Sequence, residues 1–74
     1  MKAILKYDLP GDETEFQWAM QSRGMFAVIW ELDQWLRSNT KYAPEGTHEE
    51  AYTAYELTRD RLHQLMNEQN ISFE

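Results

Sequence analysis

A chain of 74 residues, 42% of them hydrophobic, is long enough for one small helical domain, residues 1–74, in which folding buries only about 60% of the unfolded surface. The absence of cysteine excludes disulfides, and two histidines alone do not complete a structural zinc site, so self-association is the remaining way to reinforce so small a core. Thirteen acidic against seven basic residues give a net charge of −6, which argues against direct nucleic-acid binding.

The first segment, residues 2–9, alternates between apolar and polar positions and predicts a short N-terminal β-strand. The Pro-Gly pair that follows ends this strand, because proline cannot continue a ladder. Asp12 then has the position of a helix N-cap, with Glu15 as its capping-box partner. We expect a short helix that ends near Gly24, which is a suitable residue for a helix C-terminus or a hinge.

Residues 25–37 predict a second helix whose apolar side chains nearly encircle it. Five of them follow the 3–4 spacing of a core-facing stripe: Met25, Val28, Ile29, Leu32 and Leu36. Three large aromatic residues fall well outside this stripe: Phe26, Trp30 and Trp35. So short a domain has little interior for them, and we therefore expect another element or another molecule to cover this second face.

Residues 38–46 predict a loop, and Thr47 begins the last helix with Glu50 in the capping-box position. This helix carries a heptad-like seam of Ala51, Tyr55, Thr58, Leu62 and Leu65, and it is expected to end at Asn67 or Asn70. The short loop makes the two long helices an antiparallel hairpin. The tail, residues 71–74, alternates again and predicts either a short C-terminal strand beside the first one or an apolar flap on the helices.

The surplus aromatic residues predict a protein interface, because tryptophan and tyrosine dominate interface hot spots. We expect Phe26, Trp30 and Trp35 to form the contact surface of a homo-oligomer or of a partner site. Glu31 and Asp33 are expected at its rim, where they face Arg59 or Arg61 of a second subunit. The alternative is that these aromatic residues form the domain's own core.

Enzymatic chemistry has little support in this sequence. His48 and His63 lie about 22 Å apart along one helix, so one chain does not bring both to a metal ion. No serine lies in a nucleophile-elbow context, no glycine-rich phosphate loop is present, and no cofactor is indicated. The prediction is a protein that is not an enzyme.

Two alternatives from other functional classes stay open. An oligomer that sequesters a nucleotide or another anion would use cations beside aromatic faces, and its candidate residues are Arg37, Lys41, Tyr42, Arg59 and Arg61. An acidic mimic of nucleic acid would use the carboxylates of Glu45, Glu49 and Glu50.

Three segments together resemble a group of short bacteriophage proteins of unassigned function. They are MKAILKYDLP at the start, IWELDQWLRSNTKY in the middle and LHQLMNEQNISFE at the end. The resemblance covers most of the chain and is weakest over residues 16–26. It implies action in the cytoplasm of an infected bacterium, and it carries no catalytic or binding residues. No secretory signal and no apolar run of roughly 20 residues is visible, in agreement with that location.

The residues and the resemblance together predict a phage-encoded interaction protein without enzymatic activity. We expect it to be a homo-oligomer that binds and modulates a host or phage protein, for example as an inhibitor.

Overall fold

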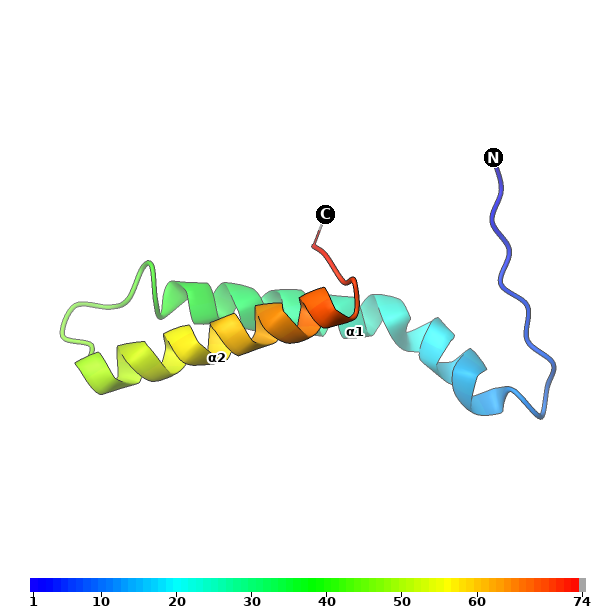
Figure 1. Ribbon diagram of the computed structural model, residues 1–74, viewed down its shortest axis with the longest axis horizontal. Coiled ribbons are helices and arrows are strands. Elements are labelled where there is room, and N and C mark those ends of the chain that lie inside the picture. Colours follow the sequence, from blue (N-terminus) through cyan, green and yellow to red (C-terminus); the bar gives the residue numbers. More distant parts are fainter. Residues whose placement is uncertain (74) are drawn as a thin grey trace.

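The computed structural model describes residues 1–73 and consists of two antiparallel helices joined by a loop (Figure 1). They are α1, Glu13–Ser38, and α2, Glu49–Glu68. The predicted helical hairpin is therefore confirmed. The molecule is elongated, with extents of 54 × 28 × 19 Å and a radius of gyration of 17.2 Å. A compact domain of this length has a radius of gyration of about 11 Å.

The predicted N-terminal strand is wrong. Residues 1–8 run as an extended segment away from the hairpin, and no strand is present within residues 1–73 (Figure 1). A strand needs a neighbouring strand for its backbone hydrogen bonds, and residues 71–73 form no strand beside this segment. The rest of the predicted C-terminal strand, at position 74, lies outside the described residues.

Asp12 precedes α1 as predicted, but its side chain makes no hydrogen bond to the helix. Its Oδ2 instead accepts a hydrogen bond of 2.9 Å from the backbone N–H of Asp8. The backbone N–H of Asp12 in turn donates to the carbonyl oxygen of Asp8 at 2.8 Å. The carboxylate therefore closes the turn before α1, and the predicted capping box with Glu15 does not form.

The predicted short helix and second helix are one continuous helix, α1, and Gly24 lies inside it. Ser22 also lies inside α1, and its hydroxyl donates to the carbonyl oxygen of Ala19 at 2.8 Å. A glycine inside a helix costs only about 1 kcal/mol, which the many helix-forming residues around it offset. The N-terminal turns of α1 incline away from the line of the remaining turns and extend past the end of α2 (Figure 1).

The N-terminus of α2 differs from the prediction, whereas its C-terminus agrees with it. The N-cap is His48 rather than Thr47, since His48 Nδ1 accepts a hydrogen bond of 3.2 Å from the backbone N–H of Glu50. At the other end Asn70 has a φ of 55°, and the N–H of Ile71 donates to the carbonyl oxygen of Met66 at 2.9 Å. This is the geometry of a Schellman motif, in which asparagine accepts the left-handed conformation.

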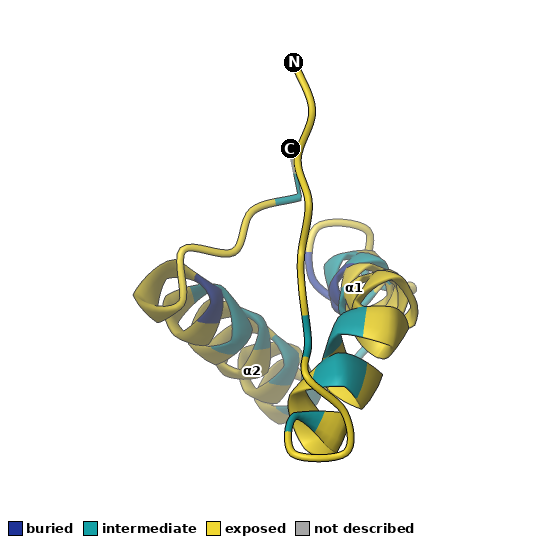
Figure 2. Ribbon diagram, turned by 90° about the vertical axis from the view of Figure 1, so that its right-hand side faces the viewer, coloured by how far each residue is buried: buried dark blue, intermediate teal, exposed yellow. Residues whose placement is uncertain are grey.

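The core between the helices is very small (Figure 2). Within residues 1–73 the buried apolar side chains are Leu36 and Met66, and the buried polar ones are Asp33 and Thr40. Three members of the predicted stripe of α1 remain exposed: Met25, Val28 and Leu32. The residues of α2 that are not exposed form one row, which consists of Ala51, Tyr55, Arg59, Leu62, His63 and Met66. This row shares Ala51, Tyr55 and Leu62 with the predicted heptad seam, whereas Thr58 and Leu65 are exposed. Steps of four residues dominate this row, as the 3.6-residue period of a straight helix favours.

Candidate protein-interaction site

An open hollow on one flank of the hairpin brings together three of the predicted interface residues. It measures about 310 Å³ and is lined by Phe26, Ala27, Trp30 and Glu31 of α1 and by Phe73 of the tail. We call it the aromatic hollow. Trp30 retains 46% of its surface exposed, although it is one of the largest apolar side chains of the chain. Such a partly open aromatic surface is typical of a protein interface.

The C-terminal tail completes the aromatic hollow because the turn at Asn70 directs it back over the helices. The ring of Phe73 packs edge to face on Phe26 with centroids 5.7 Å apart. The same ring meets the imidazole of His63 on α2 at 6.4 Å. Phe73 thus joins the two helices, and the alternative of an apolar flap describes this tail better than a strand does.

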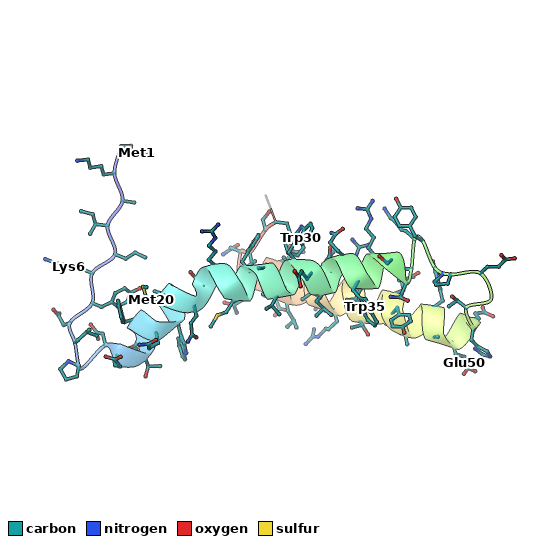
Figure 3. All side chains as sticks on the ribbon, turned by 180° about the vertical axis from the view of Figure 1, so that it is seen from behind. Met1, Lys6, Met20, Trp30, Trp35 and Glu50 are labelled. Carbon is teal, nitrogen blue, oxygen red and sulfur yellow. The ribbon has the colours of Figure 1, made fainter. Side chains whose placement is uncertain are left out.

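Trp35 does not belong to the aromatic hollow. Five residues separate it from Trp30, which corresponds to about 140° around the helix. Figure 3 shows the two indoles on different sides of α1. Trp35 packs edge to face on Tyr55 of α2 with centroids 5.2 Å apart, while 52% of its own surface remains exposed. The three predicted aromatic residues therefore occupy two separate surfaces of the hairpin.

Asp33 lies between the helices and not at a rim, with only 2% of its surface exposed. Its Oδ1 accepts a hydrogen bond of 3.0 Å from Arg59 Nε, and its Oδ2 one of 3.4 Å from Arg59 Nη2. His63 Nε2 lies 2.6 Å from the same Oδ1. The predicted pairing with Arg59 thus occurs, but it joins α1 to α2 within one chain.

The electrostatics of this cluster favour an ionised Asp33. Burial of the carboxyl group is the largest single influence and acts to raise its pKa. The hydrogen bonds and positive charges of Arg59 and His63 together outweigh it, so the pKa of Asp33 lies below its ordinary value of 3.8. The cluster therefore acts as a charged bridge between the helices.

The sequence contained a signal for this bridge that its pattern analysis missed. Asp33 is spaced four residues after Ile29 and three before Leu36, which places a carboxylate in the middle of the buried stripe. Arg59 and His63 have the i, i+4 spacing of one helix face. A buried acid needs a cationic partner, and these two residues supply it.

The other predicted rim charges remain on the surface. Glu31 lies at the aromatic hollow and has no ion-pair partner within residues 1–73. Arg61 forms no ion pair with the acids of residues 1–73, and its Nη1 donates a hydrogen bond of 2.8 Å to Gln64 Oε1.

The candidate anion-binding residues do not converge on one cationic pocket in the single chain. The guanidinium of Arg37 stacks over the ring of Tyr42 at 5.5 Å, and its Nε atom is buried without a hydrogen-bond partner in the described part of the chain. Lys41 and Arg59 line a different hollow, which also contains the carboxylates of Glu56 and Asp60 and thereby offsets their charge.

The side chain of Tyr52 borders the same hollow. Its hydrogen bond with the carboxylate of Glu56 raises the pKa of the Tyr52 hydroxyl. A tyrosine already bonded to an acid offers an anion a weaker donor, so this hollow gives the anion alternative little support.

No family model matches this chain, and neither the curated proteins nor the solved structures contain a significant match to it. Neither helix combines the length and apolar character needed to cross a lipid bilayer, over the residues that are described. Among residues 1–73, no three acidic, histidine or cysteine side chains are grouped so as to hold a metal ion.

Proposed function

We propose that this chain is a non-enzymatic interaction protein, a homo-oligomer that binds and modulates another protein in the cytoplasm of a phage-infected bacterium. The observation that carries the proposal is the aromatic hollow, in which Phe26, Trp30 and Glu31 are gathered on one open surface. The phage setting rests on the resemblance of the three sequence segments described above.

The chemistry of the aromatic hollow favours a partner with an apolar side chain next to a basic group. Trp30 and Phe26 offer a large apolar area at a small cost in side-chain entropy. The carboxylate of Glu31 at the edge has no ion pair within residues 1–73 and attracts a lysine or arginine of the partner. The net charge of −6 favours encounter with a basic surface. Few interface residues carry most of the affinity, and a half-exposed tryptophan is a typical one.

The bridge of Asp33, Arg59 and His63 supports a role without catalysis. Both oxygens of the carboxylate are engaged by side chains of the same chain, at distances of 2.6 to 3.4 Å. This arrangement stabilises the contact between the helices, because Arg59 and His63 of α2 are both bonded to the carboxylate of Asp33.

The test is capture of partners from a bacterial lysate by the tagged chain, followed by calorimetry with each purified candidate. We expect Trp30→Ala to weaken a genuine complex at least tenfold, because hot-spot truncations cost about 2 kcal/mol or more. Met20→Ala is the matched control, since Met20 is also exposed on α1 but lies outside the aromatic hollow. Equal binding by both variants and the unchanged chain would contradict the proposal.

A second candidate function is sequestration of an anionic ligand, favoured by the buried and unpartnered Nε atom of Arg37 beside Tyr42. Thermal melts with a panel of nucleotides test it. A specific ligand at 100 times its dissociation constant stabilises the fold by about 2.7 kcal/mol, whereas an unchanged melting temperature across the panel rejects this candidate.

A further inference from the structure

A second apolar surface, distinct from the aromatic hollow, spans both helices. We call Leu32 of α1 and Leu57, Leu62 and Leu65 of α2 the leucine face. Together with Thr58 and Arg61 these residues line one open hollow of about 460 Å³. Leu57 is 64% exposed, and Leu32 and Leu65 are 44% exposed each.

The leucine face and the aromatic hollow lie on different flanks of α1. Leu32 follows Trp30 by two residues, which corresponds to about 200° around the helix. No residue lines both hollows. One surface can therefore be covered while the other stays accessible.

The total surface of the chain is larger than that of a compact chain of the same mass. The chain exposes 6675 Å² of solvent-accessible surface, whereas a compact monomer of 8.9 kDa exposes about 4,800 Å². This excess of about 1,900 Å² includes the extended residues 1–8 as well as the exposed leucine face, and each subunit of an obligate homodimer buries roughly 1,000 to 2,500 Å². With only Leu36 and Met66 as its buried apolar side chains in residues 1–73, the hairpin has too small a core to be stable alone.

The distribution of charge indicates that the covering molecule is a second copy. Two copies with a net charge of −6 repel one another, and repulsion is least where no carboxylates meet. None of the six residues that line the hollow of the leucine face is acidic. Its only charged residue is Arg61, whose guanidinium is bonded to Gln64 of its own helix.

We propose that two copies of this chain pair through their leucine faces about a two-fold axis, which places four helices around a shared apolar core. The pairing deepens the proposed function, since it assigns the self-association to one face and leaves the aromatic hollow of each copy open for the partner. The dimer has two equivalent partner sites.

The first test measures oligomeric state. Light scattering of the unchanged chain is expected to give a dimer, and Leu32→Glu and Leu65→Glu are expected to lower the apparent association constant at least a hundredfold. Met20→Glu is the matched control, because it adds the same charge to an exposed apolar position of α1 outside the leucine face. A dimer that survives both leucine substitutions overturns the assignment of the face, and a monomeric unchanged chain overturns self-association altogether.

The effect of either leucine substitution on association is interpretable only where the variant still folds, so a second test leaves the leucine face intact. The described residues contain no cysteine, which permits single-cysteine variants. Thr58→Cys places a thiol in the leucine face, and Thr53→Cys places one on the same helix outside that hollow. A short bis-maleimide is expected to link copies of the Thr58→Cys variant only.

Equal cross-linking of the two cysteine variants, or none in either, contradicts pairing through the leucine face. Both tests use the pure protein, whereas the proposed function is tested by Trp30→Ala in the presence of a partner. Self-association and partner binding are therefore measured separately, and either one can fail without the other.

Discussion

The imidazole of His63 and the carboxylate of Asp33 lie 2.6 Å apart, from Nε2 to Oδ1, across the contact between the two helices. The carboxylate is buried, while 44% of the His63 side chain is exposed to solvent. Arg59 Nε donates to the same Oδ1 at 3.0 Å and completes the bridge. Charge, rather than apolar packing alone, therefore joins α1 to α2 in a protein whose apolar core is minimal.

The substitution Asp33→Asn is expected to destabilise the fold by about 1 to 3 kcal/mol, because it leaves the donors of Arg59 and His63 without a charged acceptor. Urea unfolding followed by circular dichroism, at one fixed protein concentration, measures the change. Glu31→Gln is the control, since Glu31 is an exposed acid of the same helix without an ion pair in residues 1–73, and its effect should stay within about 0.5 kcal/mol. Equal effects of the two substitutions would show that the bridge contributes nothing.

The lowered pKa of Asp33 predicts a loss of stability in acid. The unfolded chain binds a proton at this carboxyl more readily than the folded chain does, so ionised Asp33 stabilises the fold above its ordinary pKa of 3.8. That contribution disappears as the pH falls through the lower pKa of the folded state. Urea midpoints measured from about pH 6 down to pH 2 should fall less steeply in Asp33→Asn than in the unchanged chain. Parallel curves would contradict the prediction.

Gly24→Ala is expected to stabilise the protein by about 0.5 to 1 kcal/mol, because alanine loses less conformational freedom in a helix than glycine does. Apart from its chain neighbours and the backbone of its own helix, a Cβ atom at this position meets no atom within 4 Å, so the substitution adds no steric conflict. The melting temperature by circular dichroism measures it. Gly46→Ala is the opposite control, since Gly46 has a φ of 84° and alanine is strained there. Destabilisation by Gly24→Ala would indicate that the helix is interrupted at Gly24 and that α1 is not continuous.

The contact between Phe26 and Phe73 is expected to stabilise the closed tail by about 0.5 to 1.5 kcal/mol, as edge-to-face aromatic pairs do. A double-mutant cycle of Phe26→Leu and Phe73→Leu, measured by urea unfolding, isolates this pair from the change in apolar area. A coupling energy of zero would mean that the tail does not close the aromatic hollow in solution. The pair of Tyr7 and Phe16, with centroids 5.8 Å apart, gives a matched cycle outside the hairpin contact.

The hairpin, its loop and the turn at Asn70 could be predicted because each depends on local signals. Apolar spacing marked the helices, and asparagine marked the left-handed residue at the end of α2. The N-terminal strand could not be judged in this way, because alternation predicts a strand only when a neighbouring strand exists. The continuity of α1 was missed because a single glycine indicates a helix end and a tolerated interior residue equally well.

The candidate site was predictable in composition but not in arrangement. Phe26, Trp30 and Glu31 do share one surface, as their density in one helix indicated. Trp35 lies on another side, because its spacing of five residues from Trp30 corresponds to about 140° around the helix, whichever face is buried. The role of Phe73 depends on where the tail turns, and that contact between distant residues leaves no periodic trace in the sequence.

The fork formed by Arg59 around the Asp33 carboxylate also determines how the two helices are aligned lengthwise. Sliding α2 by one turn, about 5.4 Å, would carry the guanidinium beyond reach and strand a negative charge in an apolar gap. Contacts of leucine and methionine tolerate such a shift in register, because apolar contacts are not directional. This single ion pair therefore selects one register of the two helices among several that would bury similar apolar area.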